Sequence, residues 1–306
     1  MVDDQKHEMD PETHLTEVKE WHSNRLMELR KPDGWLSVIG LHWLRPGENT
    51  FGSDPSNAVV FPDLPEIPDR IGSFILENNR VHMVVEPEVN VTIQGEPVTS
   101  TVIHGKSKRP ITASLGSLHW QVIKRQDLFG VRLRNSVNPA IEAFKGVECF
   151  PVSLGWRIPA RFDRYDPPIR IEVPNVLGQI NMQRSPGAVV FSVGDIEYRL
   201  DVTGNPGDKT FFIVFGDMTN GHETYKHGRF IRVDAPDDDG WLYIDFNKAH
   251  NPPCGFTDYA TCPTPPSQNR LSIRIEAGEK VYKHTNNRLI YGINREKQIY
   301  PQLSNR

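Results

Sequence analysis

The sequence has few cysteines and no long apolar run, and these two absences exclude several classes of protein. It holds 3 cysteines in 306 residues, which is too few and too odd a number for a secreted disulfide framework. No apolar run approaches the roughly 18 residues that a membrane-spanning helix needs. The N-terminal residues MVDDQKHEMD are polar and acidic, so no secretory signal is predicted. We therefore expect no membrane association and a cytoplasmic location.

An excess of basic charge is also lacking. The formal net charge is −4 and the isoelectric point is near 6.3, so the chain offers no basic field to a polyanion. We therefore expect no nucleic-acid partner. With 37% hydrophobic and 24% charged residues, the composition is that of a folded globular protein.

Familiar catalytic and cofactor motifs are missing too. The sequence contains no G-x-S-x-G elbow, no phosphate-binding G-x-x-x-x-G-K-[ST] loop and no H-E-x-x-H zinc motif. The acidic run from Asp237 to Asp239 lacks the ligand spacing of a calcium loop and is interpreted as a solvated turn. No cofactor is predicted.

The N-terminus predicts one helix over residues 11–31. Asp10 suits the N-cap position, and Pro11 suits the first helical position. The helix should end near Lys31, because Pro32 disfavours helical geometry in the residue before it. We expect this helix to cover a sheet and not to carry chemistry.

From Gly34 onward the pattern changes to short strands separated by turn residues. The predicted strands are Trp35–Leu44, Ala58–Phe61, Gly72–Glu77, Arg80–Val85, Val89–Gln94, Leu118–Arg125, Phe129–Arg134, Ile169–Val173, Ala188–Val193, Ile196–Val202, Thr210–Phe215, Glu223–Phe230, Trp241–Asn247 and Leu271–Glu276. Hairpin turns are expected at Asn78-Asn79 and at Asn220-Gly221, since Asn and Gly tolerate positive φ. The fold class is therefore predicted to be all-β, with an N-terminal helix.

The basic, polar stretch between Gly105 and Gly116 is the predicted domain boundary. It separates a small β-sandwich over residues 33–105 from a larger β-barrel or sandwich over residues 117–283. Residues 284–306 are predicted to be a tail that either packs or frays.

The hairpin predicted over residues 215–230 gathers polar side chains. A two-residue turn would place Asp217 and Thr219 on one strand, and Tyr225 and Arg229 on the next. These groups could converge on a ligand. The alternative is a charged hairpin whose surface residues are satisfied locally, and the pattern alone favours that alternative.

The strand predicted over residues 241–247 continues into a proline-rich loop. Asp245 and Asn247 share one face of that strand, and Asn251 and Tyr259 follow in the loop, which reaches Asn269. Such acid and amide groups can orient a polar substrate. They can equally well hydrogen-bond the loop backbone, which would otherwise lack partners.

Cys254 and Cys262 lie in the same loop. Their spacing does not match a zinc knuckle, although His250 completes a weak H-x3-C-x7-C pattern. A structural pair of thiols is favoured over zinc binding. A disulfide is expected to be disfavoured in a reducing cytosol.

Two arginines precede the acidic stretch at Asp163. Arg157 and Arg161 would lie on one face of an extended segment, where guanidinium groups suit carboxylate or phosphate recognition. The alternative is ion pairing with Asp163, Asp166 or Glu172.

Two long motifs carry a resemblance to a known family. GDMTNGHETYKHGRF, followed by DFNKAHNPPCGFTDYATCPTPPSQNRLSIRIEAGEK, closely resembles the C-terminal signature of the uncharacterised family catalogued as domain of unknown function 1684. DGWLSVIGLHWLRPGENTFGSD resembles the start of that family, so the resemblance extends over residues 15–283. The resemblance implies no activity. A tyrosine is usual in the family where this chain has His250, which weakens a zinc-binding role for that imidazole.

A second resemblance concerns architecture alone. GENTFGSDPSNAVVF and VNVTIQGEPV resemble the forkhead-associated sandwich. The Arg, Ser and His pattern that reads phosphothreonine in that fold is not matched, so the resemblance implies at most a similar sandwich.

The leading functional hypothesis is a polar pocket in the larger domain that binds a small polar or anionic molecule, with hydrolysis as the first guess for a reaction. The predicted catalytic residues are Asp245, Tyr225 and Arg229. The predicted ligand-binding residues are Asp217, Thr219, Asn247, Asn251, Tyr259, Asn269, Arg157 and Arg161. The rival hypothesis is a non-catalytic module that binds a ligand or an unknown protein partner. A second alternative is zinc binding by Cys254, Cys262 and His250.

Overall fold

A computed structural model describes residues 9–105 and 110–283 of the chain. The contacts divide the described residues into two compact units. Unit 1 comprises residues 9–28 and 145–283, and unit 2 comprises residues 29–144. Most regular structure in both units is β-strand, so the predicted all-β fold class with an N-terminal helix is confirmed.

Helix α1 spans Pro11–Arg30, close to the predicted bounds. Asp10 caps it, because its Oδ2 atom accepts a hydrogen bond from the backbone N–H of Thr13 at 2.9 Å. The remaining helices are short: α2 (Pro139–Ala143), η1 (Trp35–Ser37), η2 (Leu154–Trp156), η3 (Phe246–Lys248), η4 (Pro253–Gly255) and η5 (Ser267–Asn269). No helix among the described residues has the length and apolar character needed to cross a bilayer.

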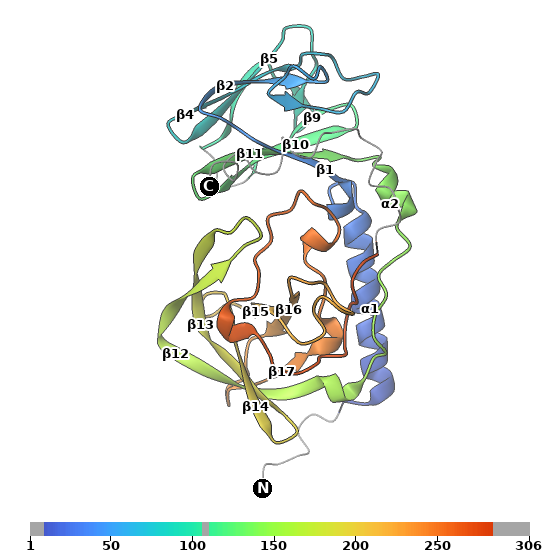
Figure 1. Cartoon of the computed structure of the whole chain (residues 1–306), viewed down its shortest axis with the longest axis vertical. Coiled ribbons are helices and arrows are strands. Elements are labelled where there is room, and N and C mark those ends of the chain that lie inside the picture. Colours follow the sequence, from blue (N-terminus) through green and yellow to red (C-terminus); the bar gives the residue numbers. More distant parts are fainter. Residues whose placement is uncertain (1–8, 106–109, 284–306) are drawn as a thin grey trace. The chain divides into compact units, whose positions relative to one another are not determined.

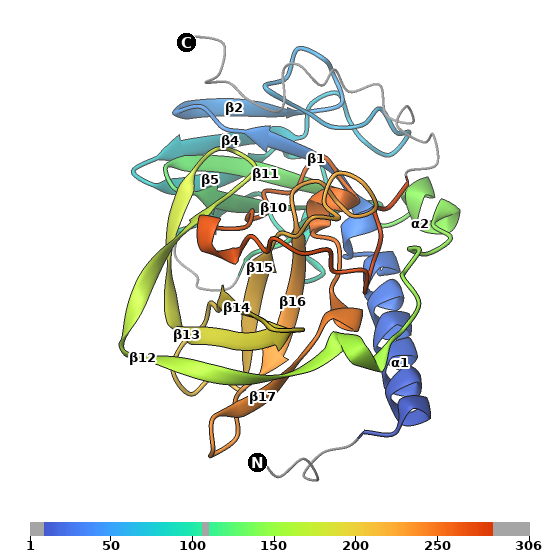
Figure 2. The same cartoon turned by 60° about the horizontal axis from the view of Figure 1, so that its bottom comes forward.

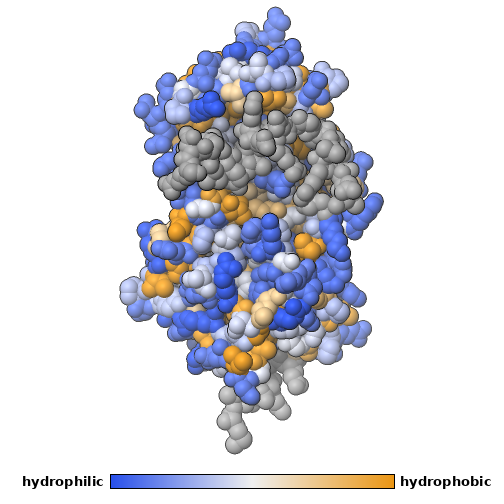
Figure 3. Space-filling view, in the orientation of Figure 1, coloured by the Kyte–Doolittle hydropathy of each residue, from blue (hydrophilic) through white to orange (hydrophobic). Residues whose placement is uncertain are grey.

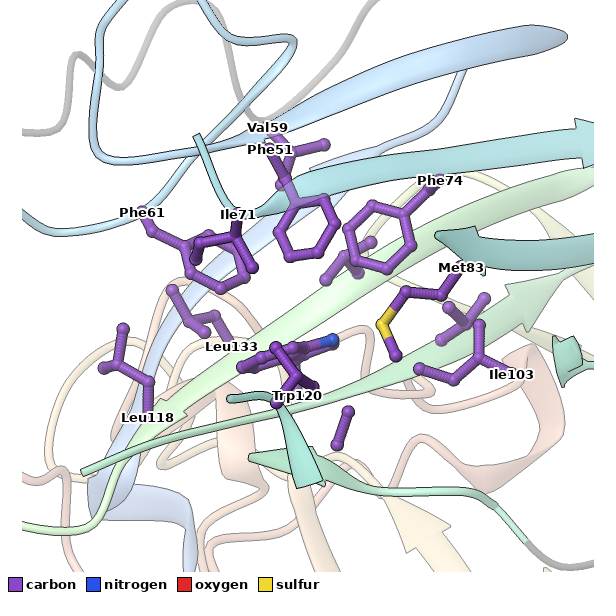
Figure 4. Packing of buried hydrophobic residues seen from close by; sticks show 14 of the residues in the cluster. Phe51, Val59, Phe61, Ile71, Phe74, Met83, Ile103, Leu118, Trp120 and Leu133 are labelled. Atoms are coloured by element: carbon purple, nitrogen blue, oxygen red, sulfur yellow. The ribbon is translucent and has the colours of Figure 1, made fainter. Parts of the chain in front are cut away.

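Unit 2 contains two sheets. In order across the six-stranded sheet, the strands are β1 (Val38–Trp43), β11 (Leu128–Asn135), β10 (Leu118–Arg125), β9 (Ala113–Leu115), β6 (Thr92–Ile93) and β7 (Glu96–Pro97). In order across the five-stranded sheet, they are β3 (Val59–Val60), β2 (Gly47–Gly52), β4 (Gly72–Glu77), β5 (Arg80–Val85) and β8 (Ser100–His104). Phe51 and Phe74 from one sheet and Trp120 from the other meet in a single core (Figure 4). Their rings stack or meet edge to face, with centroids 4.2 Å apart for Phe51–Phe74 and 5.9 Å apart for Phe51–Trp120.

The division between the units differs from the predicted boundary at residues 105–116. Strand β11, which was assigned to the larger domain, pairs with β1 of the predicted small sandwich. Strand β10 pairs with β11 and with β9, which lies in the predicted boundary. The bounds of both strands were predicted closely, but a local pattern does not specify a pairing partner. The predicted tail over 284–306 lies outside the described residues.

Unit 1 contains a four-stranded and a two-stranded sheet. The strands are β14 (Ile196–Asp201), β13 (Ile180–Val193), β12 (Arg157–Pro174) and β17 (Trp241–Asp245) in the first, and β15 (Thr210–Phe215) and β16 (Arg229–Asp234) in the second. The long β12–β13 hairpin curves beside β15 and β16, and α1 runs along the other side of this unit (Figures 1 and 2). Phe191, Phe215 and Phe246 bring the sheets together in one core.

The two predicted hairpin turns had different outcomes. Asn78 and Asn79 both have positive φ and join β4 to β5, as predicted. The turn predicted at Asn220-Gly221 is wrong as a strand connection, because Phe215 pairs with Arg229 and the whole of residues 216–228 forms a loop. The strand predicted over 223–230 is therefore displaced to β16, and residues 271–276 form no strand.

The surface of unit 1 has a mixed character. On the face shown in Figure 3, hydrophobic residues form small groups among hydrophilic ones. Exposed large hydrophobic side chains in unit 1 include Ile180, Met182 and Trp241.

Candidate functional site

The loop over residues 216–228 is built around a buried ion pair. Arg229 Nη2 lies 2.8 Å from Asp217 Oδ2, and both side chains are 0% exposed. The guanidinium also donates to the carbonyl oxygens of Ile275 (2.8 Å) and Ala277. Burial lowers the pKa of Arg229, while the Asp217 carboxylate opposes that shift. The Arg229 guanidinium therefore holds the backbone of residues 275–277 in place. Its positive charge is paired with Asp217 and is not available to a ligand.

The same carboxylate organises the loop. Asp217 Oδ1 accepts hydrogen bonds from the backbone N–H of Thr219 (2.8 Å) and from its hydroxyl (2.5 Å). The hydroxyls of Thr219 and Thr224 lie 2.8 Å apart, and Asn220 donates to Thr224 at 2.8 Å. Predicted site residues Asp217 and Thr219 are thus brought together, but within a closed network inside the protein.

Asp245 is engaged by groups of the protein itself. His14 Nε2 lies 2.9 Å from Asp245 Oδ2. The Oδ1 atom accepts hydrogen bonds from the backbone N–H of Asn247 (3.1 Å) and from its side chain (2.8 Å), which caps helix η3. Asn247 also bonds the backbone of Ser153 through both its amide atoms. Asp245 remains 11% exposed, so a narrow face of the carboxylate reaches solvent.

The two other predicted asparagines also bind backbone. Asn251 donates to the carbonyl of Lys280 at 2.7 Å. Asn269 accepts from the N–H of Asp201 at 2.8 Å and donates to the carbonyls of Asp201 (2.9 Å) and Val214 (3.0 Å). Both side chains are buried, so their amides satisfy loop backbone and leave little for a ligand.

Helix α1 contributes a polar group of residues that the sequence analysis missed. Arg25 forms an ion pair with the buried Glu279, with Nε and Oε1 2.5 Å apart, and donates to the carbonyl of Asn251 at 2.9 Å. His22 Nε2 lies 3.3 Å from Cys149 Sγ. The signal was present in the sequence, because His14, His22 and Arg25 recur at helical spacing with the apolar residues of the packed face.

Burial and the nearby Glu279 raise the pKa of Cys149 to about 12. Burial also lowers the pKa of His22, so the neutral imidazole and the neutral thiol are the stable forms at neutral pH. A thiol in that state is a weak nucleophile.

His250 fills an aromatic position in the core. Its ring centroid lies 5.7 Å from that of Trp21 and 6.1 Å from that of Phe230. Burial lowers the pKa of His250 to about 3, so the ring is neutral. No group of three or more His, Cys, Asp or Glu side chains suited to a metal ion occurs in the part of the chain that the structure describes, so the zinc alternative has no supporting third ligand there.

Tyr225 lies beside the cysteine loop. Its hydroxyl donates to the carbonyl of Cys254 at 3.2 Å, and burial raises the pKa of Tyr225 well above its ordinary value. Each cysteine sulfur accepts the backbone N–H of the other cysteine, at 3.1 Å for Cys254 N to Cys262 Sγ and 3.3 Å for the reverse contact. Tyr259 is half-buried in the same loop, where its N–H donates to Thr257.

The predicted arginines lie elsewhere, on the outer face of β12. Arg157 packs over the ring of Tyr243, with its guanidinium carbon 3.6 Å from the ring centroid. Arg161 is exposed and pairs in register with Trp241, which is 44% exposed. The cation–aromatic pairing of Arg157 was not among the alternatives considered from the sequence.

One exposed basic group stands out on the same loop as the buried ion pair. The basic corner consists of Lys226, His227 and Arg270, all exposed. Partial desolvation, and then the charges of Lys226 and Arg270, lower the pKa of His227. The ring of His227 meets that of Tyr225 edge to face, with centroids 5.7 Å apart.

Gly228 allows this arrangement. A Cβ atom on Gly228, whose φ is +87°, would lie 2.4 Å from Pro265 Cγ, so the turn of residues 225–228 can rest on Pro265 only with glycine there. On the other side, Arg270 pairs with Gly216 and donates to the carbonyl of Pro265 at 3.3 Å. Pro265 therefore has the histidine turn on one side and the arginine on the other.

The region that carries these contacts matches a known protein family. Residues 142–280 match the family described as protein of unknown function (DUF1684). The match covers less than half of the chain. The resemblance predicted from the C-terminal motifs is thereby confirmed, and the DUF1684 region coincides with most of unit 1. No curated protein matches the sequence.

Several solved structures match parts of the chain, and two of them show how far the likeness goes. An uncharacterized protein from Haloarcula marismortui, determined by NMR in solution, is 25% identical, with a TM-score of 0.38 over 46% of this chain and 80% of its own. A forkhead-associated domain studied for phosphothreonine-dependent interactions is 15% identical, with a TM-score of 0.22 over 32% of this chain and 95% of its own. Neither match is close enough to identify a ligand.

Proposed function

We propose that the DUF1684 region binds a small anionic ligand at the basic corner of Lys226, His227 and Arg270. The observation that carries this proposal is a group of exposed basic side chains without acidic partners. Among residues 9–105 and 110–283, neither Lys226 nor Arg270 forms an ion pair. Like charges held together repel one another, and a bound anion would relieve that repulsion.

The backbone supports the same interpretation. The turn that carries Lys226 and His227 depends on Gly228, and Arg270 is tied to Pro265 and Gly216. The side chains therefore project from fixed positions, which lowers the entropy cost of ligand binding. The charges that shift the pKa of His227 are those of Lys226 and Arg270, both positive.

The proposal keeps the predicted ligand class but changes the residues that bind it. Arg229 was the expected anion partner, yet its charge is compensated inside the protein by Asp217. Hydrolysis at Asp245 has less support than binding, because Asp245, Tyr225 and Arg229 each hydrogen-bond neighbouring protein groups.

Sulfate is a suitable probe, because its charge does not change between pH 5 and 8. We expect sulfate to shift the amide resonances of residues 225–228 and 270 in an NMR titration at low ionic strength. Lys226→Gln and Arg270→Gln should each weaken sulfate binding about tenfold, which corresponds to one charge-assisted hydrogen bond of about 1.4 kcal/mol.

A matched control separates a site from a general effect of net charge. Lys209→Gln removes an exposed positive charge at the end of β15 opposite the loop over residues 216–228. If this control weakens sulfate binding as much as the corner variants do, the proposed site is wrong. Affinity should also rise as the pH falls and His227 becomes protonated, and His227→Gln should remove that rise.

A further inference from the structure

The pair of cysteines in the loop over residues 250–269 has a geometry that goes beyond a structural clasp. The backbone N–H of Cys254 points at the sulfur of Cys262, 3.1 Å away, and the backbone N–H of Cys262 points at the sulfur of Cys254, 3.3 Å away. Each sulfur is therefore held against the backbone of the other cysteine. Both residues are thiols in the structure.

We propose that Cys254 and Cys262 form a reversible disulfide by exchange with a low-molecular-weight disulfide, such as oxidised glutathione. This inference is independent of the proposed anion site. It rests on two thiols held side by side and on backbone N–H donors that stabilise a thiolate at either sulfur.

The exchange proceeds in two balanced steps. The Cys254 thiolate attacks one sulfur of the small disulfide, a mixed disulfide forms at Cys254, and one small thiol leaves with the proton. The Cys262 thiolate then attacks the Cys254 sulfur, and the second small thiol leaves with the second proton. The cysteines are oxidised by two electrons, and the small disulfide is reduced to two thiols.

Exposure sets the order of these steps. Cys254 is half-buried, whereas Cys262 is only 5% exposed, so an external disulfide reaches Cys254 more readily. Cys262 is then placed to act as the resolving thiol, because its backbone already contacts the Cys254 sulfur.

Hydrogen bonds to the backbone hold both cysteines in place. The carbonyl of Cys262 accepts a hydrogen bond from Val176 at 3.0 Å, and the carbonyl of Cys254 accepts one from Tyr225 at 3.2 Å. These bonds involve carbonyl atoms that take no part in the exchange.

Cys149 offers an internal comparison. Its sulfur contacts His22 and the carbonyl of Val147, and no cysteine is among its contacts in the described residues. Burial and Glu279 keep it protonated. We therefore expect Cys149 to react slowly and to stay outside the exchange.

The test is incubation of the intact protein with oxidised glutathione, followed by mass spectrometry. The expected product has lost the mass of two hydrogen atoms and gives a Cys254–Cys262 linked peptide after digestion. The melting temperature of the oxidised protein should rise by roughly 5 °C, because the link restricts the unfolded chain. A stable single glutathione adduct, or a link through Cys149, would overturn the proposal.

Variants test the assigned order. Cys262→Ser should stop at a glutathione adduct on Cys254, and Cys254→Ser should react at least about tenfold more slowly than the parent. Cys149→Ser should form the Cys254–Cys262 link at the parental rate. If a serine variant fails to fold, the corresponding alanine variant and the linked peptide of the parent protein still decide the outcome. Equal rates for Cys254→Ser and the parent would contradict the mechanism.

Discussion

One loop of unit 1 holds charged residues of two opposite kinds. At the base of residues 216–228, Asp217 and Arg229 are fully buried and face each other at 2.8 Å. Near the end of the same loop, Lys226 and His227 are exposed and are joined by the positive charge of Arg270. The buried pair is neutral as a unit, whereas the basic corner has uncompensated charge.

The contrast shows how burial decides the role of a charged residue. Folding removes water from Asp217 and Arg229, which costs free energy. Several hydrogen bonds to each side chain within the fold offset that cost. The residues of the basic corner keep their hydration and contribute little to folding. Their charge is therefore available to a ligand, and the two groups should respond differently to mutation.

The largest expected effect comes from breaking the buried pair. Arg229→Met or Asp217→Ala leaves the opposite charge buried without its partner, so we expect a loss of about 3–5 kcal/mol in the free energy of unfolding. Urea denaturation followed by circular dichroism measures this loss. Lys226→Gln, on the same loop, should change the free energy of unfolding by no more than about 0.5 kcal/mol.

A small effect of Arg229→Met would contradict this assignment. In particular, a loss below about 1 kcal/mol combined with lost sulfate binding would move the anion site from the basic corner to Arg229. Arg229→Met should therefore affect the free energy of unfolding and not the sulfate site, whereas Lys226→Gln should do the reverse.

The pH dependence of unfolding compares a buried histidine, His250, with an exposed one, His227. Burial lowers the pKa of His250 to about 3, against an ordinary value of 6.5. Between these two pH values His250 is protonated in the unfolded chain and neutral in the folded protein. Its contribution to the free energy of unfolding is therefore fully present above pH 6.5 and is lost as the pH falls. The loss from this one group is up to about 1.4 kcal/mol per pH unit.

His250→Phe isolates this contribution. Phenylalanine suits the aromatic position between Trp21 and Phe230 and cannot be protonated. At about pH 4.5 the variant should recover roughly 3 kcal/mol relative to the parent's loss from pH 7. His227→Phe, at the exposed corner, should leave the acid dependence of unfolding nearly unchanged. If both variants behave alike, burial does not distinguish the two rings.

The sequence predicted local elements well where a single strand carries its own pattern. The bounds of strands such as Gly72–Glu77, Leu118–Arg125 and Thr210–Phe215 were correct, because alternation and turn residues are local signals. The connection between β15 and β16 was wrong, because the Asn220-Gly221 dipeptide imitates a hairpin turn while Asp217 ties the loop to Thr219.

The location of the candidate site stays a prediction, and the sequence did not show which partners its residues bind. The polar residues of the loops at 216–228 and 250–269 do gather in unit 1. Sequence alone could not show that Asn247, Asn251 and Asn269 bind distant backbone, since those partners come from the tertiary fold. For the same reason it could not pair Arg25 with Glu279.

Asp245 is less buried than the Asp217–Arg229 pair and more buried than the basic corner. Its substitution gives the smallest of the expected changes in the free energy of unfolding. Its carboxylate is 11% exposed, contacts His14 and caps helix η3 through Asn247. Asp245→Asn keeps one oxygen for the cap but loses the charge that faces His14, so we expect a loss of about 1–2 kcal/mol in the free energy of unfolding. Asp239→Asn, in the exposed turn before β17, should cost less than about 0.5 kcal/mol in the same urea titration. An Asp245→Asn variant as stable as this control would show that the carboxylate is not needed for folding, and would restore it as a candidate catalytic group.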